Sequence, residues 1–233
     1  MLYGLVGGDR KALATPKARG VCPSCGQVLI AKCGQIKVWH WAHKTGFDCD
    51  SWYEGESDWH LGWKKLVMPE FCEVVFGANR EHRADIVGNN GVVVELQNSA
   101  ISPVDIQERE KFYEDMIWLF NGKSFNIEVE ICFKHIYHTW KVYGSAIPLY
   151  EYYRLKIPSL IDILYYIRRD EISFINVHHK RGRLFNCITK PLFIHVVNVI
   201  ILVDQYSPYY CRAKKIYSEK EFMQKYLSDV LEF

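Results

Sequence analysis

The stretch HRADIVGNNGVVVELQNS (82–99) joins two apolar runs through the turn sequence Asn89-Asn90-Gly91, a pattern that predicts a β-hairpin. Each arm nevertheless contains an acid, Asp85 in the first and Glu95 in the second. A charge inside an apolar strand costs free energy unless a partner or a metal ion compensates it. The hairpin therefore predicts a polar site as well as part of a sheet.

The turn determines which side chains face each other. If residues 89–91 form a three-residue loop, Asp85 lies directly opposite Glu95, with Cβ atoms about 5 Å apart. Gln97 then shares a face with Glu95, because strand side chains alternate with a period of two. A tighter turn at Asn90-Gly91 shifts the register by one residue and leaves Asp85 diagonal to Glu95.

Two carboxylates this close repel each other, and one pKa rises unless a cation lies between them. Hard oxygen ligands of this kind suit Mg²⁺ or Mn²⁺. Such an ion can activate water and stabilise the charge that develops on a phosphate during cleavage. We therefore expect Asp85 and Glu95 to be metal ligands.

A helix predicted over residues 55–67 adds a polar row, because Glu56, His60 and Lys64 follow one another at i, i+4 and i+8. Glu56 could bind the metal ion or orient a metal-bound water. His60 and Lys64 could contact phosphate or assist proton transfer. An ordinary solvated Glu–His–Lys row is the alternative.

A second cluster combines cysteines with histidines. CPSCG supplies Cys22 and Cys25, and HWAH supplies His40 and His43 after a predicted hairpin with its turn near residue 34. Zinc favours tetrahedral sets of thiolates and imidazoles, so these four side chains predict a structural zinc site. Cys49 could replace one histidine, and a redox-active or incidental CxxC is the alternative.

Composition sets the broad class. The chain has 233 residues, 49% hydrophobic and 24% charged, which is typical of a globular protein. The longest apolar run, residues 191–203, is shorter than the ~20 residues of a membrane span and predicts a buried strand. Because we see no charged leader before an apolar core, we expect a cytoplasmic protein. The other five cysteines are then expected to be packing residues or non-ligands rather than disulfides: Cys33, Cys72, Cys132, Cys187 and Cys211.

Three segments follow one another along the chain. Residues 1–50 form the predicted zinc module, with seven Lys or Arg against one acid in residues 1–44. Residues 45–120 hold fifteen acids against six bases. Residues 51–122 predict a helix, a strand over 72–77, the hairpin, and a second helix over 102–120. Basic residues 1–44 before acidic residues 45–120 suit a polyanion-binding module next to a metal site. A run of like charges can also be a solvent-exposed face without a ligand.

The third segment, residues 123–233, is expected to complete the sheet and the substrate surface. Its predicted elements are strands over 125–133 and 191–203, a helix over 157–171, and a closing helix that begins with the capping box of Ser218 and Glu221. The basic run HHKRGR (178–183) could add phosphate contacts or be a solvated loop.

Five pieces of the sequence carry a resemblance to a known family: CPSCGQVLIAKCGQIKVWHWAHK (22–44), GESDWHLGWK (55–64), HRADIV (82–87), VVVELQNSAIS (92–102) and EREKFYEDMIWLF (108–120). In this order they resemble the competence protein CoiA-like family, a branch of the PD-(D/E)XK nuclease superfamily. The resemblance implies an α+β or α/β fold, a restriction-endonuclease-like core in which helices flank a mixed four-stranded sheet, with a small zinc-binding β-hairpin module before it. It also implies action on DNA, in recombination during transformation or in mobile-element and defence contexts.

Carried over by position, the resemblance makes Asp85 and Glu95 metal ligands and Glu56 the helix-borne acid of the site. Gln97 stands where the superfamily commonly has a catalytic lysine, which would orient the attacking water and stabilise negative charge. Some members carry glutamine or glutamate there and still cut. We hypothesise that Lys64 supplies the missing charge from the helix.

Three functions follow from these observations. The leading expectation is an Mg²⁺- or Mn²⁺-dependent DNA nuclease that hydrolyses phosphodiester bonds and carries a structural zinc module. The second is a catalytically weak or inactive DNA-binding recombination accessory protein. The third is a zinc-dependent interaction protein, in which Arg83 or Arg109 pairs with the hairpin acids. The sequence leaves open whether the chain forms a homo-oligomer or binds a recombination or defence protein. We expect no membrane partner.

Overall fold

The computed structural model describes residues 1–44, 46, 49–53, 55–133, 153–155, 172–178, 185–196, 198–205 and 210–227. These residues form a mixed α and β structure with two sheets and three α-helices. The expected combination of helices with a sheet is confirmed at this coarse level. The chain divides into two compact units, which are described separately. The first unit holds Met1–Ser99, Arg109–Trp118 and Met223–Phe233, and the second holds Ala100–Glu108 and Leu119–Phe222.

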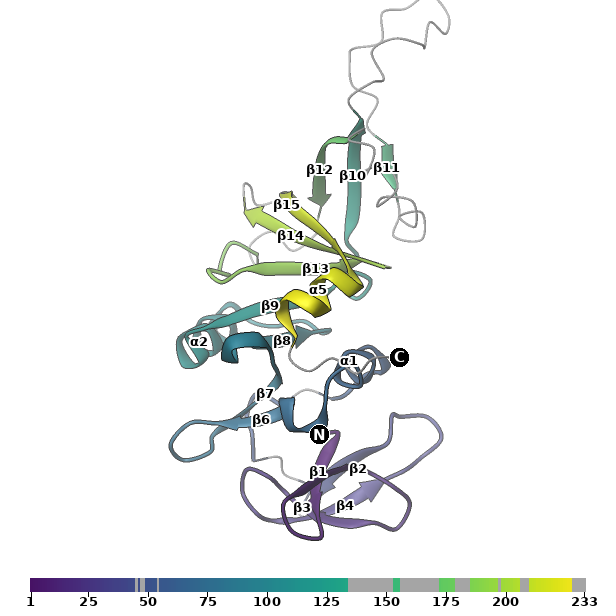
Figure 1. Ribbon diagram of the computed structural model, residues 1–233, viewed down its shortest axis with the longest axis vertical. Coiled ribbons are helices and arrows are strands. Elements are labelled where there is room, and N and C mark those ends of the chain that lie inside the picture. The colour runs from purple at the N-terminus through teal and green to yellow at the C-terminus, as the bar shows by residue number, and fades with distance from the viewer. Residues whose placement is uncertain are drawn as a thin grey trace, which may run out of the picture. The chain divides into compact units, whose positions relative to one another are not determined.

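The first unit begins with a five-stranded antiparallel sheet in the order β2-β1-β3-β4-β5. Figure 1 labels β1, β2, β3 and β4 of this sheet. Its strands are β1 (Tyr3–Val6), β2 (Arg10–Leu13), β3 (Arg19–Val21), β4 (Val28–Lys32) and β5 (His40–His43). The predicted pairing of the two strands around residue 34 is confirmed, since Lys32 lies opposite His40. Leu29 and Trp41 form the buried centre of this sheet with Met1, Ala14 and Cys22.

Helix α1 (Asp58–Lys64) is shorter than the helix predicted over residues 55–67. Ser57 is its N-cap, and the Ser57 side chain accepts a hydrogen bond from the backbone N–H of His60. Glu56 therefore precedes the helix, and its expected place on a helical turn is wrong. The cap explains the difference, because it begins the helix after Glu56.

The predicted hairpin is present with the predicted register. A short 3-10 helix (Pro69–Phe71) precedes β6 (Cys72–Phe76), which pairs with β7 (His82–Val87), which in turn pairs with β8 (Val93–Gln97). The backbone N–H of Gly88 donates to the Val92 carbonyl across 2.7 Å, so residues 89–91 form the three-residue loop. The tighter-turn alternative is thereby excluded.

The segment after the hairpin differs from its prediction. Helix α2 (Pro103–Tyr113) begins as expected, because the Ser102 Oγ accepts from the Asp105 backbone N–H. It ends seven residues early, at Tyr113, before Glu114, whose φ of 55° is left-handed. Residues Met116–Asn121 form strand β9 instead. A segment that is buried on both faces is apolar at every position, so its sequence lacks the hydrophobic periodicity that distinguishes a strand from a helix. This explains the error.

The second unit contains an antiparallel arrangement in the order β11-β10-β12-β15-β14-β13. Its strands are β10 (Glu128–Phe133), β11 (Tyr153–Leu155), β12 (Ile172–His178), β13 (Leu192–Val196), β14 (Val199–Gln205) and β15 (Tyr210–Ser218). The single strand predicted over residues 191–203 is wrong, because β13 and β14 pair as a hairpin with Val196 opposite Val199.

Helix α5 (Glu219–Tyr226) confirms the predicted capping box. The Ser218 Oγ accepts from the Glu221 backbone N–H at 3.2 Å, and the Glu221 carboxylate accepts from the Ser218 backbone N–H at 2.7 Å. The predicted helix over 157–171 and most of the basic run, residues 179–183, lie outside the described residues. Within the described residues, no helix combines the length and the apolar character that crossing a bilayer requires.

Candidate functional site

The first candidate site is a cluster of three thiols and one imidazole in the first unit. The Sγ atoms of Cys22 and Cys49 are 3.6 Å apart, and the Cys25 Sγ is 3.3 Å from the His43 Nε2. All four ligand atoms lie within 4.8 Å of one another. A tetrahedral zinc ion with bonds of about 2.0–2.3 Å needs ligand atoms about 3.3–3.8 Å apart. The cluster can therefore hold a structural zinc ion.

The ligand set differs from the first expectation at one position, because Cys49 stands in place of His40. The side chains of β5 alternate between the two faces of the sheet, so His40 and His43, three residues apart, point to opposite faces. The His40 Nδ1 donates to the Val38 carbonyl at 2.8 Å instead. The alternative in which Cys49 replaces a histidine agrees with the cluster, and Cys33 is not part of it.

Crowding of the thiols favours a bound cation. Burial and the neighbouring Cys22 sulfur raise the pKa of the Cys49 thiol to about 12. Thiolates at this distance repel one another, and zinc compensates their charge when it binds. Four protein ligands leave no open position, which is typical of a structural zinc site.

The second candidate site is a cavity of about 40 Å³ in the same unit, which is large enough for a few water molecules. Asp85 and Glu95 both line this cavity, so the two acids of the hairpin face the same space. Its other charged or titratable lining residues are Asp50, Tyr53, Glu56, His60, Lys64, Glu73, Arg83, Arg109 and Tyr113.

The strands separate where the acids lie. The ladder between β7 and β8 pairs Val87 with Val93 and Ile86 with Val94. At Asp85, next to Ile86, carboxylates replace backbone carbonyls as the acceptors of backbone N–H groups. The Leu96 N–H donates to the Asp85 carboxylate at 3.0 Å, and the Asp85 N–H donates to the Glu95 carboxylate at 3.3 Å. The carboxylates thus hold the hairpin open at the cavity.

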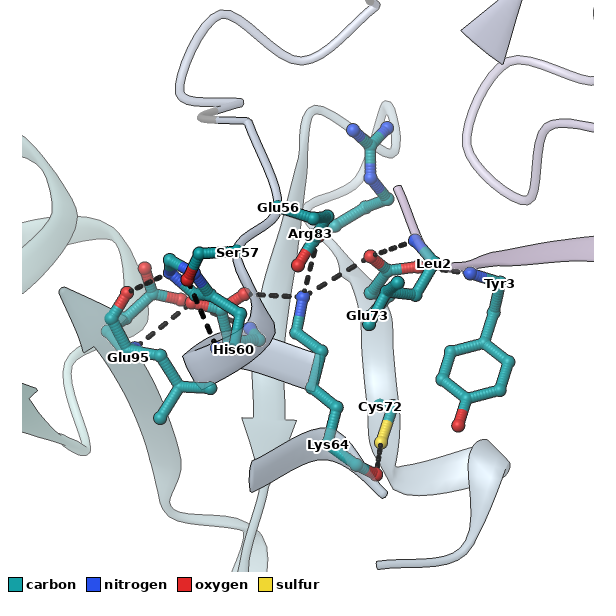
Figure 2. Close-up of polar contacts among 12 residues, drawn as sticks. Leu2, Tyr3, Glu56, Ser57, His60, Lys64, Cys72, Glu73, Arg83 and Glu95 are labelled. Atoms are coloured by element: carbon teal, nitrogen blue, oxygen red, sulfur yellow. Dashed lines mark hydrogen bonds and ion pairs between the residues drawn. The ribbon is translucent and has the colours of Figure 1, made fainter. Parts of the chain in front are cut away.

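Lys64 lies among three carboxylates at the centre of the site (Figure 2). Its Nζ is 2.8 Å from Asp85, 3.0 Å from Glu56 and 3.3 Å from Glu73, and the side chain is only 1% exposed. Burial alone would lower the pKa of Lys64, but the three carboxylates outweigh it and raise the pKa well above the ordinary value. Lys64 is therefore a permanent buried cation.

Glu73 belongs to the cavity although it was not predicted. Its carboxylate accepts hydrogen bonds from the backbone N–H groups of Leu2 and Tyr3, both at 2.8 Å (Figure 2). Burial works to raise its pKa, but Lys64 and these donors hold the pKa of Glu73 below its usual range. An acid inside the apolar run CEVVF is the same kind of signal that singled out Asp85, but nothing in this segment assigns Glu73 to the site.

His60 and Gln97 lie nearby in structural contacts. The His60 Nε2 donates to the Leu96 carbonyl at 3.1 Å, and its Nδ1 is 2.8 Å from the Ser57 Oγ, so the imidazole connects α1 to β8. Gln97 is fully buried and donates from its Nε2 to the Ser99 carbonyl at 3.0 Å. Gln97 is not among the lining residues of the cavity.

Arg109 is the second buried cation of the site. Its Nη1 donates to the Glu95 carboxylate at 3.1 Å and its Nη2 donates to the Trp52 carbonyl at 3.0 Å. An ion pair between Arg109 and Glu95, one of the alternatives for the hairpin charges, is thus present. The cationic partner at Asp85 is Lys64.

Negative charge remains in excess at the cavity. Burial, followed by the nearby Asp85, raises the pKa of Glu95 to about 7 against the opposing effect of Arg109. Burial, with contributions from Glu73 and Asp85, raises the pKa of Glu56 to about 7 against the effect of Lys64. Burial is thus the main reason why both pKa values are raised, and the neighbouring carboxylates add to its effect.

Asp50 connects the two candidate sites. It follows the cluster ligand Cys49 in the chain, and its carboxylate accepts from the His82 Nδ1 at 2.8 Å and from the Arg83 backbone N–H at 2.9 Å. These residues begin β7, which carries Asp85 two positions further on. The Arg83 guanidinium in turn lies 3.4 Å from the Cys49 Sγ.

Comparison with known proteins adds one match, to the family model described as Competence protein CoiA, N-terminal domain, over residues 7–51. The matched segment contains Cys22, Cys25, His43 and Cys49. Searches of curated proteins and of solved structures gave no match. Residues 7–51 of this chain are therefore similar to the CoiA N-terminal domain.

Proposed function

We propose that the chain is a metal-dependent DNA nuclease that acts in the handling of DNA during competence or recombination. The observation that carries the proposal is the convergence of Asp85 and Glu95, from two strands that separate at this point, on one cavity. The match of residues 7–51 to the CoiA N-terminal domain supports the competence-related setting.

The order of elements also supports the nuclease interpretation. Helix α1 is followed by β6, β7, β8, helix α2 and β9, and the four strands are neighbours in the order β9-β8-β7-β6. The resemblance to the PD-(D/E)XK superfamily implies four strands and two helices in this order, but a sheet of four, whereas here the four strands belong to a sheet of ten. The acids lie on the second and third of these strands, at the separated end of the hairpin.

The residues fit a divalent ion by charge and by chemistry. Asp85 and Glu95 offer hard carboxylate oxygens that face the same cavity, and a cation between them would stabilise both in their ionised form. When bound, Mg²⁺ or Mn²⁺ supplies a water of lowered pKa and compensates charge on the phosphate. Glu95 would exchange part of its pairing with Arg109 for the ion.

The chain's own residues supply the remaining functions. With a pKa near 7, the Glu56 carboxylate can accept a proton from a water molecule at neutral pH, which is the property required of a general base. Lys64, 2.8 Å from Asp85, provides the positive charge that Gln97 cannot. Its ammonium can stabilise negative charge at the phosphate beside the carboxylates.

A DNA-binding accessory protein with little or no cleavage is the second candidate. The observation that favours it is the pair of internal ion pairs, Lys64 with Asp85 and Arg109 with Glu95, which occupy both acids. A chain that keeps both pairs would bind DNA without a catalytic ion.

The test is cleavage of plasmid and single-stranded DNA with Mg²⁺ or Mn²⁺ by the wild type, Asp85→Ala and Glu95→Ala. Glu108→Ala is the matched control, because Glu108 is an exposed acid on α2. We expect the wild type and the control to cut and the two cavity variants to lose most activity. Equal cutting by all four proteins would contradict the assigned site, and absence of cutting by the wild type would favour the accessory protein.

A further inference from the structure

A larger cavity of about 430 Å³ lies on another side of helix α1. Asp58, Leu61 and Lys65, spaced at i, i+3 and i+7, line this cavity. His60 and Lys64, on the adjacent face of the same helix, line the carboxylate cavity. Asp58 and Leu61 of α1, with the C-cap residue Lys65, thus line the larger cavity, whereas His60 and Lys64 of the same helix line the carboxylate cavity.

The other wall of the larger cavity is the loop between β4 and β5, residues 34–39, together with Leu13 and Ala14. We call the cavity with this loop the 34–39 groove. Ile36 is 98% exposed and Trp39 is 47% exposed. The Trp39 Nε1 donates to the Gly34 carbonyl at 3.1 Å, which restrains the indole within its own loop. Folding alone gives no reason to expose these large apolar side chains.

The charges of the groove favour a polyanion. Lys37 and Lys65 line it, and among the lining residues that the structure describes Asp58 is the only acid. Residues 1–44, which contribute the loop, hold seven Lys or Arg against one acid. Proteins that bind single strands combine cations for the phosphates with aromatic faces on which bases stack. A duplex keeps its bases paired and would use the cations alone.

We propose that the 34–39 groove binds single-stranded nucleic acid, with a base stacked on Trp39 and phosphates at Lys37 and Lys65. The inference rests on the proposed function, because α1 places the groove next to the carboxylate cavity in which the phosphodiester would be cut. According to this inference, the substrate has a single-stranded segment, which lies in the groove on this side of α1.

Binding is tested by fluorescence anisotropy of a labelled oligothymidylate with the full chain, zinc retained and no Mg²⁺ or Mn²⁺ added. We expect Trp39→Ala to weaken binding about 5- to 150-fold, the range for loss of one base stack, and Trp39→Phe to retain most of the affinity. Lys65→Ala is expected to reduce the slope of log Kd against log salt concentration by about 0.7. Lys111→Ala, an exposed lysine on α2, is the matched control and should leave the slope unchanged.

Unchanged oligothymidylate binding by Trp39→Ala, with a melting temperature equal to that of the wild type, would overturn the inference. Tighter binding of an acidic amphipathic peptide than of the oligonucleotide would also overturn it, and would assign the groove to a protein partner. The two proposals fail separately. Binding through Trp39 without any cleavage removes the nuclease proposal alone, whereas Asp85-dependent cleavage with normal binding by Trp39→Ala removes the groove alone.

Discussion

Lys64 balances the charge of three buried carboxylates, Glu56, Glu73 and Asp85, from a single atom. Removal of one partner from a buried ionic cluster costs more than the pair contributes, since it leaves charges uncompensated in a low-dielectric environment. The structural and the proposed catalytic roles of Lys64 therefore cannot be separated by loss of activity alone.

Lys64→Met is expected to lower the free energy of unfolding by about 3–5 kcal/mol at pH 8. The loss should be smaller at pH 5, because Glu56, with a pKa of about 7, is then protonated and needs no cation. Urea denaturation at both pH values measures this difference. Lys65→Met, at the exposed neighbouring position, should change the free energy of unfolding by less than about 0.5 kcal/mol. Equal losses for Lys64→Met at both pH values would contradict the charge assignment.

Glu95 gives stability a pH dependence of opposite sign to that of an ordinary paired acid. Its pKa is about 7 in the folded chain, against an ordinary value of 4.5, so between these values the folded state binds more protons than the unfolded state. Stability therefore falls as the pH rises from about 4.5 to 7. Glu95→Gln should remove a contribution on the order of 1–3 kcal/mol to this fall, measured by denaturation across the range. The same pH profile for both proteins would disprove the raised pKa.

Single residues of the candidate site could be predicted from the sequence where a charged residue interrupts an apolar run. Asp85 and Glu95 were predicted from that signal and lie at one cavity. Glu73 shows the same signal but could not be assigned, because its partners, the backbone N–H groups of Leu2 and Tyr3, are about 70 residues away in sequence. Asp50 was missed because a side chain that accepts backbone N–H groups leaves no pattern in its own segment.

At the scale of elements, the N-terminal sheet supplies a zinc cluster from a turn, a strand end and a loop. The alternation of side chains in β5 excludes His40 and the fold brings in Cys49. Spacing alone could not make that choice, because two residues three apart share a face on a helix but not on a strand.

Because the cluster offers one set of four ligands, we expect metal analysis of the purified protein to find one zinc ion per chain. Cys49→Ala should lose the metal and lower the melting temperature, whereas His40→Ala should retain the metal with a melting temperature near that of the wild type. Zinc retention by Cys49→Ala together with loss by His40→Ala would reverse the ligand assignment.

The hairpin turn depends on Gly88. A Cβ at this position would meet the backbone carbonyl of Tyr226, which cannot move aside as a flexible side chain would. Gly88→Ala is expected to destabilise the protein by about 1–3 kcal/mol in urea denaturation. Gly91→Asn is the matched control, because Gly91 faces open space and asparagine tolerates its φ of 80°. Equal stability of the two variants would show that the contact at Gly88 is not tight.

The type of an element could be predicted where the sequence shows hydrophobic periodicity, a turn signal or a helix cap, and could not be predicted where these signals are absent. The turn Asn89–Gly91 and the caps at Ser102 and Ser218 were correctly assigned. The runs that became β9 and the β13–β14 hairpin were misassigned, since a fully buried strand and a buried helix show the same uninterrupted apolar sequence.

At the scale of the whole molecule, the basic N-terminal residues and the acids of the carboxylate cavity belong to one compact unit. Asp50 connects the Cys/His cluster to β7, and α1 lines both cavities, so the cluster, the 34–39 groove and the carboxylates share one scaffold. This sharing could not be predicted from the sequence, because it depends on contacts between segments that carry no common pattern.

The central claim is that Asp85 and Glu95 bind one divalent ion. Crystals of the protein soaked in Mn²⁺ test it directly through the anomalous scattering of manganese. We predict an anomalous peak within about 2.0–2.3 Å of a carboxylate oxygen of each residue, lost in Asp85→Asn and retained in Glu108→Ala. Mn²⁺-soaked crystals with no peak at these oxygens, and with Lys64 and Arg109 still paired to Asp85 and Glu95, would contradict the claim.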